Sequence, residues 1–142
     1  MDKELKRQII LDNYQNPFHK SIPEDNNYLK VNSNNVNCID NIDLYILFDG
    51  STIKDICFEG EACAITTSST SIMIQNLRGK TVSDAIEYID NFSNMIEEKP
   101  YDKELLNDAI VYDEIYKQAS RKTCATLPYK GIKKILEEKT LS

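Results

Sequence analysis

The stretch LYILFDGSTIKDICFEGEACAITTSSTS, residues 44–71, predicts how the first half of this chain folds. It opens with two runs rich in β-branched, aromatic and aliphatic residues, 44–48 and 52–58. The dipeptide Asp49-Gly50 lies between the two runs and is a strong signal for a tight hairpin turn. We therefore predict two antiparallel strands joined at this turn.

The end of the same stretch has a different character. Gly60 follows the second run, and Cys63 comes three residues later, at the point where a helix should begin. Six consecutive Thr or Ser residues, 66–71, then open a segment that stops near Arg78-Gly79, a typical helix end. We expect the small residues of this run to let neighbouring parts of the chain approach the helix closely.

The flanking segments supply one more strand and several helices. A short strand is expected around residues 28–31, before the hairpin. The spacing of apolar residues predicts helices over residues 2–14, 66–77, 82–96, 102–116 and 121–138. This order indicates an α+β fold, in which a small antiparallel sheet in the N-terminal half has helices packed on one face. At 142 residues the chain is expected to form a single domain, 1–142.

Two of these helices carry finer expectations. In the first helix, Leu5, Ile9 and Ile10 form the expected buried stripe. In the last helix, Pro128 and Gly131 weaken the middle, so that a kink or a late start is expected.

Composition and charge narrow the class of protein. The chain is 41% hydrophobic and 28% charged, as in ordinary globular proteins, and its formal net charge is −6. An acidic chain argues against nucleic acid as a partner, because a phosphate-binding domain is normally basic. No apolar run approaches the length of a membrane-spanning helix, and the N-terminus lacks an apolar signal region. We expect a cytoplasmic protein that uses neither nucleic acid nor a membrane.

The charges are unevenly distributed along the second half of the chain. Residues 81–116 hold ten acidic and two basic side chains, whereas residues 117–139 hold seven basic and two acidic ones. Two solvated helix faces of opposite sign would explain this pattern. A surface for docking a partner beside Cys124 would explain it as well.

The four cysteines are Cys38, Cys57, Cys63 and Cys124. A chain without a signal sequence is expected in a reducing compartment, where disulfides are rare. No C-x-x-C pair is present, which argues against a thioredoxin-like motif and a zinc knuckle. Cys57 lies in mid-strand between two apolar residues, as inert buried thiols usually do.

The other three cysteines lie near the ends of predicted elements, where functional groups are usually displayed. Cys38 and Asp40 point to the same side of an extended chain, Cys63 lies at a helix N-terminus, and Cys124 follows two cations that would favour its thiolate. Three thiolates and a carboxylate suit zinc, and the thiolates also suit an iron–sulfur cluster. Scattered structural thiols remain the alternative, because these spacings fit no local metal-binding loop.

Four motifs in order resemble one family, the SufU-type iron–sulfur cluster assembly proteins of the IscU/NifU N-terminal superfamily. They are LDNYQNP (11–17), NCID (37–40), FEGEACAI (58–65) and RKTCATL (121–127), and together they extend over nearly the whole chain. The resemblance implies a SufU/IscU-like fold. Within this superfamily, Thr123 before the last cysteine and an insertion at about residues 100–120 are typical of the SufU branch.

The resemblance also implies functional residues. Cys38, Asp40, Cys63 and Cys124 would bind zinc, and the three cysteines could carry a transient iron–sulfur cluster. Cys124 would accept persulfide sulfur from a SufS-like cysteine desulfurase, with Arg121 as an auxiliary residue and other Suf components as further partners. Such a protein acts as a co-substrate of the desulfurase, which leaves open whether it counts as an enzyme.

Two residues depart from the family pattern. Ile39 and Ala62 stand where the family has glycine. If either position had a positive φ, the replacement would strain the backbone, and Ile39 would cost more because it is β-branched.

Two other functions compete with sulfur transfer. A cysteine-nucleophile enzyme would need a base, but the only histidine, His19, is far from every cysteine along the sequence and is expected to be an ordinary loop residue. A zinc-stabilised binding module without sulfur transfer would use the metal for folding only, and would unfold when the metal is removed.

Overall fold

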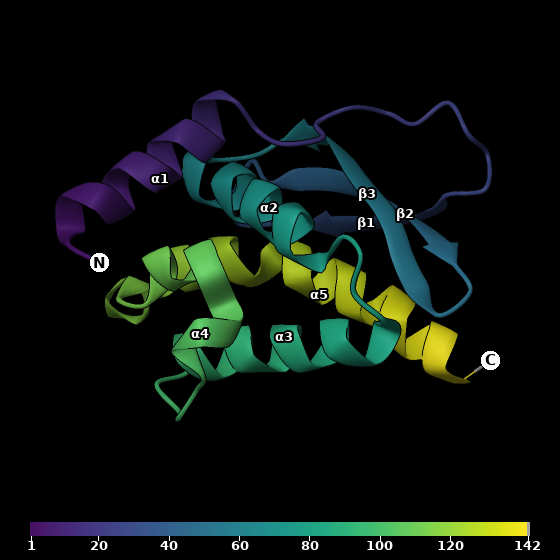
Figure 1. Cartoon of the computed structure of the whole chain (residues 1–142). Coiled ribbons are helices and arrows are strands. Elements are labelled where there is room, and N and C mark those ends of the chain that lie inside the picture. Colours follow the sequence, from purple (N-terminus) through teal and green to yellow (C-terminus); the bar gives the residue numbers. More distant parts are fainter. Residues whose placement is uncertain (142) are drawn as a thin grey trace.

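The hairpin predicted at Asp49-Gly50 is present and joins the central strand of a three-stranded sheet to one edge strand (Figure 1). The structure is a computed structural model, and it describes residues 1–141. Within that range the elements are α1 (Lys3–Gln15), β1 (Leu29–Asn34), β2 (Asn41–Asp49), β3 (Thr52–Glu61), α2 (Ala64–Leu77), α3 (Val82–Ile96), α4 (Lys103–Leu106), the 3-10 helices η1 (Asn107–Tyr112) and η2 (Ile115–Lys117), and α5 (Ala119–Leu141).

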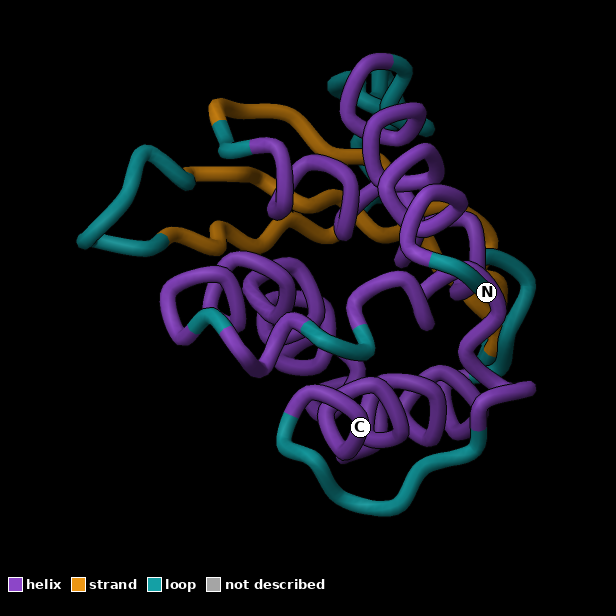
Figure 2. The backbone as a smooth tube through the Cα atoms, turned by 90° about the vertical axis from the view of Figure 1, so that its left-hand side faces the viewer, coloured by secondary structure: helices purple, strands orange, loops and turns teal. Residues whose placement is uncertain are grey.

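The sheet is antiparallel, with the strand order β1-β2-β3. Alternate residues of β2, namely Ile42, Leu44 and Ile46, are fully buried, as expected of a strand with one face on the core. Figure 2 shows the strands as one layer above the helix that carries the C-terminus. The α+β fold with helices on one face of the sheet is therefore confirmed.

Helix α2 lies between α1 and α5 (Figure 1). The whole Ser/Thr run, 66–71, is buried, so these hydroxyls need partners inside the protein. Ser69 donates a hydrogen bond to the Ala125 carbonyl of α5 (2.6 Å), and Ser71 donates one to the Asn13 side chain of α1 (2.7 Å). The small side chains let both helices pack closely on α2, as expected from the sequence.

Helix α3 has the predicted bounds and the predicted amphipathic character. Thr81 caps it by accepting a hydrogen bond from the Asp84 backbone N–H at 3.1 Å. On its buried face, Phe92 stacks on Tyr129 of α5, with ring centroids 4.1 Å apart. An aromatic stack therefore forms part of the contact between α3 and α5.

The prediction of one helix over residues 102–116 is wrong. The segment turns at Asn107, whose φ of 49° and ψ of −127° end α4, and it continues as η1 and η2. The Asn107 side chain donates a hydrogen bond to Asn76 of α2 at 2.9 Å. The break at Asn107 is thus accompanied by a contact with α2, which the spacing of apolar residues could not indicate. Ala109 and Tyr112 still point into the core.

The expected burial of α1 is wrong at one position. Leu5 is 49% exposed, while Ile9 and Ile10 pack against the core from the edge. The last helix is longer than predicted and contains Pro128 in its interior. Within residues 1–141, no helix is both long enough and apolar enough to cross a membrane.

Candidate metal centre

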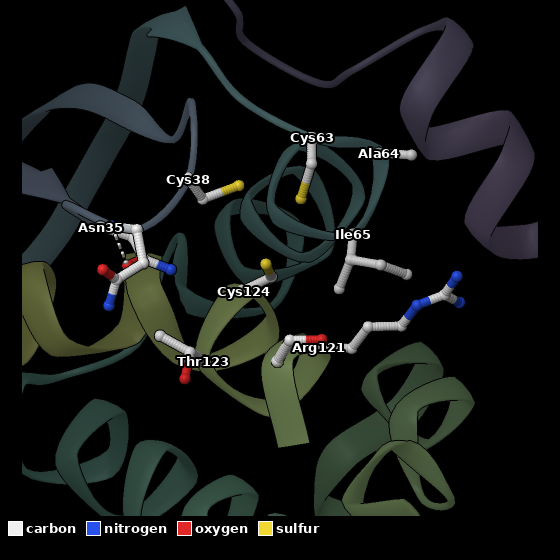
Figure 3. A pocket seen from close by; sticks show the side chains of 10 residues that line it. Asn35, Cys38, Cys63, Ala64, Ile65, Arg121, Thr123 and Cys124 are labelled. Atoms are coloured by element: carbon white, nitrogen blue, oxygen red, sulfur yellow. Dashed lines mark hydrogen bonds between the residues drawn. The ribbon is translucent and has the colours of Figure 1, made fainter. Parts of the chain in front are cut away.

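The structure brings Cys38, Asp40, Cys63 and Cys124 together, although they lie in four different parts of the chain (Figure 3). One ligand atom from each lies within 4.8 Å of the others. Cys38 and Asp40 come from the connection between β1 and β2, Cys63 is the N-cap of α2, and Cys124 lies near the start of α5. The donor atoms are three sulfurs and one carboxylate.

Cys38 is the exposed member of the group. Its backbone N–H donates to the Asn35 carbonyl at 3.0 Å, and the Asn37 N–H donates to the Asn35 side chain at 3.1 Å. These bonds shape the tight turn that presents the thiol. Ile39 is 66% exposed and, like every non-glycine residue of 1–141 except His19, Glu98 and Asn107, has no positive φ. The strain considered for Ile39 is therefore absent.

Asp40 is the most buried member, with 1% of its surface exposed. One carboxylate oxygen accepts the Cys63 backbone N–H at 2.7 Å, and the other accepts the Thr66 hydroxyl at 2.8 Å. Burial alone would raise the pKa of this carboxyl, but the hydrogen bonds from Cys63, Thr66 and Cys124 outweigh it and lower the pKa below its ordinary value. Asp40 is thus held as an oriented anion at the floor of the centre.

Cys63 is positioned by the entrance to α2. Its sulfur lies 3.5 Å from the Thr66 backbone N–H, which it caps. Just before it, Gly60 has a φ of 133°, and a Cβ there would lie 2.2 Å from the Asn41 carbonyl. Gly60 is therefore required for the chain to leave β3 in this direction. Ala62 has no positive φ, so the family glycine is not needed at that position.

Cys124 is buried, and a proline shapes its surroundings. Pro128 lacks the N–H that would bond to the Cys124 carbonyl one turn earlier. The Thr66 hydroxyl lies 3.2 Å from that carbonyl and 2.8 Å from the Asp40 carboxylate. Thr66 of α2 thereby connects α5 with Asp40, the residue just before β2. Neither Thr66 nor Pro128 was among the predicted site residues, and only the Ser/Thr run and the mid-helix proline signalled them.

The expectation that neighbouring cations favour a thiolate at Cys124 is wrong for the metal-free chain. Burial, reinforced by Cys63 and Asp40, raises the pKa of the Cys124 thiol to about 12. Lys122 points to Glu97 of the segment after α3, 3.5 Å away, and Figure 3 shows the Arg121 guanidinium turned away from the three sulfurs. A thiol in this environment stays protonated at neutral pH.

The three sulfurs line a hollow of about 550 Å³. Arg121 and Thr123 of α5 and Ile65 of α2 complete its wall (Figure 3). The hollow leaves the centre open on one side to a large partner or a small ligand. Three thiols and an oriented carboxylate fit a tetrahedral zinc ion, because zinc prefers such donors in this number.

Comparison with known proteins agrees with this geometry. A family model described as the NifU-like N terminal domain matches residues 5–125. The chain belongs to this family. The zinc-dependent sulfurtransferase SufU of Bacillus subtilis is 37% identical over 131 residues, which cover 92% of this chain and 88% of that protein. The iron–sulfur cluster assembly scaffold protein IscU of Streptococcus pyogenes is 32% identical, over 94% of this chain and 83% of the relative.

Solved structures of the NifU-like family share the fold. The crystal structure of SufU from Fervidobacterium islandicum aligns with a TM-score of 0.80 and 34% identity, covering 92% of each chain. The N-terminal part of a NifU-like protein from Brucella abortus aligns with a TM-score of 0.82 at 18% identity, a likeness of fold alone. The resemblance to SufU-type proteins expected from the motifs is therefore confirmed.

Proposed function

We propose that this NifU-like chain is an iron–sulfur cluster assembly protein that accepts sulfur from a SufS-like cysteine desulfurase, with zinc at the centre formed by Cys38, Asp40, Cys63 and Cys124. The convergence of these four side chains, with the three cysteines lining one hollow, carries the proposal. The name of the Bacillus subtilis relative, a zinc-dependent sulfurtransferase, supports it.

The residues of the centre prepare Cys124 for this role. Asp40 accepts hydrogen bonds from the Cys63 backbone N–H and the Thr66 hydroxyl, and burial beside Cys63 and Asp40 raises the pKa of the Cys124 thiol. Bound zinc would hold the sulfurs as thiolates at neutral pH, which the metal-free chain cannot do for Cys124.

The transfer step follows thiol exchange chemistry. The Cys124 sulfur attacks the outer sulfur of the persulfide on the desulfurase cysteine, and a new sulfur–sulfur bond forms. The bond between the two persulfide sulfurs of the desulfurase breaks, and its cysteine leaves as a thiolate. Cys124 then carries the persulfide. Arg121 receives only an auxiliary role, because it lines the hollow with its guanidinium away from the sulfurs.

A second candidate is a scaffold that holds a nascent iron–sulfur cluster on Cys38, Cys63 and Cys124. The IscU relative, named as a scaffold, favours this function, and three convergent thiols suit it chemically. The two functions are compatible, since a persulfide on Cys124 would supply sulfur to a cluster built at the same centre.

The decisive experiment measures desulfurase turnover with and without this protein. We expect Cys124→Ala to abolish the stimulation that the wild-type chain produces, because the attacking sulfur is gone. The matched control is Lys130→Ala, an exposed change further along the same helix, which should stimulate like the wild type. Full stimulation by Cys124→Ala would overturn the acceptor role.

A further inference from the structure

A second cluster of metal-binding side chains lies at β3, an edge strand of the sheet. His19 comes from the segment between α1 and β1, and Asp55 and Cys57 come from β3. One ligand atom from each lies within 4.8 Å of the others. His19 is far from Cys57 along the sequence, but the fold brings the two side chains together. Cys57 is buried as expected, but it lies against a carboxylate instead of only apolar neighbours.

The spacing of these atoms is close to that of a zinc site. The Cys57 sulfur lies 3.5 Å from one Asp55 oxygen, and His19 Nδ1 lies 2.9 Å from the other. With zinc–sulfur bonds of about 2.3 Å and zinc–nitrogen or zinc–oxygen bonds of about 2.0 Å, a tetrahedron needs sulfur–oxygen edges of about 3.5 Å and nitrogen–oxygen edges of about 3.3 Å. The two measured distances end on different oxygens of Asp55, so the carboxylate must turn for one oxygen to serve both edges.

The Asp55 carboxylate has an oxygen that is not satisfied by hydrogen bonding. Oδ2 accepts the Tyr28 hydroxyl at 2.6 Å, which orients the carboxylate as outer donors do around metal ligands. Oδ1 is buried and has no hydrogen-bond partner, although His19 Nδ1 and Arg78 Nε lie at 2.9 and 3.0 Å. Those two groups are close enough for charge attraction but do not provide an aligned hydrogen bond. Oδ1 already lies against the Arg78 guanidinium, so a metal ion would have to compete with Arg78 for this oxygen.

We propose that His19, Asp55 and Cys57 form a second zinc site, independent of the proposed sulfur transfer. An imidazole nitrogen, a carboxylate oxygen and a thiolate are a donor set that suits zinc, and water would complete the four ligands. The side chains of His19 and Asp55 are 30% and 18% exposed, so the fourth position faces solvent.

The bound ion would tie the segment before β1 to the sheet. This segment already lies along β3, where the His19 carbonyl accepts the Phe58 backbone N–H at 3.1 Å. His19 holds a positive φ of 57° there, a conformation that needs support from its surroundings. Zinc bound by His19 and two residues of β3 would provide that support.

Replacing Arg78 distinguishes a zinc site from a cluster of ion pairs that has only a structural role. Its guanidinium lies 3.0 Å from the same Asp55 oxygen and is 39% exposed, so it occupies the edge of the site as a competing cation. Arg78→Ala should tighten zinc binding at this cluster by about threefold or more, because like-charge repulsion is removed. In an ion-pair cluster without affinity for metal, the same change would only lower stability.

The test is a zinc titration of the metal-stripped full-length chain, followed by calorimetry and by metal analysis after dialysis. We expect two zinc ions per wild-type chain, and one for Cys57→Ala and for Asp55→Asn. Lys54→Ala, an exposed change on the same strand, should keep two. His19→Ala, on the half-exposed loop, replaces Cys57→Ala if the latter fails to fold.

Cobalt provides a second readout, since its thiolate charge-transfer absorption reports each bound sulfur. A zinc content that is the same in Cys57→Ala as in the wild type, or unchanged or weaker zinc binding in Arg78→Ala, would overturn the proposal. None of these outcomes depends on desulfurase stimulation, so the second site and the sulfur-transfer function fail separately.

Discussion

At the scale of single residues, the chemistry of this protein depends on which side chains are buried next to which. Cys38 and Cys124 are both candidate ligands, yet Cys38 lies on an exposed turn and Cys124 lies in the packed start of α5. The burial that places Cys124 beside Asp40 and Cys63 also raises the pKa of its thiol, which favours the protonated form. Residue type alone therefore does not specify reactivity.

Alkylation of Cys124 in the metal-free chain should show this effect directly. Its pKa of about 12 lies above the ordinary value of 9.0, so the protonated form is favoured in the folded chain and the thiolate appears only as pH rises from 9 towards 12. Between pH 7 and pH 10 we expect its iodoacetamide reaction rate to rise about tenfold per pH unit without levelling off. Mass spectrometry of quenched samples measures the rate. A plateau near pH 9 would contradict the burial argument.

At the scale of elements, α2 packs closely against both α1 and α5. Its buried Ser/Thr run has small side chains, each of which forms a hydrogen bond with a different residue. Ser68 is an example of this pairing. Its hydroxyl lies 2.5 Å from the hydroxyl of Tyr112, a buried residue of η1. A polar helix can occupy a core only when every hydroxyl is paired.

Removing one partner of this pair should destabilise the fold. Ser68→Ala leaves the buried Tyr112 hydroxyl unpaired, and we expect a loss of about 1–3 kcal/mol in the free energy of unfolding. Tyr112→Phe should cost less hydrogen-bonding energy, because the Ser68 hydroxyl can still donate to the Ile65 carbonyl at 3.1 Å. The double variant should cost less than the two single changes together, with a coupling of about 1 kcal/mol.

Urea unfolding of the four proteins in this cycle measures the coupling. Thr126→Ala serves as the control, since that hydroxyl bonds only within α5 and its loss should change stability by no more than about 0.5 kcal/mol. Additive single changes would show that the short contact between Ser68 and Tyr112 is energetically unimportant.

At the scale of the whole molecule, the uneven charges are partly paired with one another. Lys133 of α5 lies 2.8 Å from Asp90 of α3, and Lys122 lies 3.5 Å from Glu97. Two of the basic residues counted in 117–139 are thus directed at the acidic segment 81–116 across one helix contact. This pairing favours solvated faces of opposite sign over a dedicated docking surface.

The metal centre joins the sheet, α2 and α5, but the hydrophobic core does not depend on it. The core cluster from Ile42 to Leu136 includes none of the four candidate ligands. We therefore expect the metal-stripped chain to keep its helical circular dichroism and to melt cooperatively. Zinc at about a thousand times its dissociation constant should add about 4 kcal/mol, which raises the melting temperature by about 10 °C. Magnesium should produce no such shift. Unfolding upon chelation would instead favour the zinc-stabilised binding module.

Local sequence patterns were enough to predict the hairpin, the amphipathic α3 and the position of Cys63 at a helix entrance, and they include the motifs that resemble SufU proteins. Each depends on neighbours a few residues apart, where strand alternation, helical periodicity and turn residues act. Tertiary structure alone decided the break at Asn107, the exposure of Leu5, the protonated state of Cys124 and the meeting of His19 with Cys57. These features depend on contacts between distant segments, and no spacing along the chain specifies the burial or the charge that such contacts create.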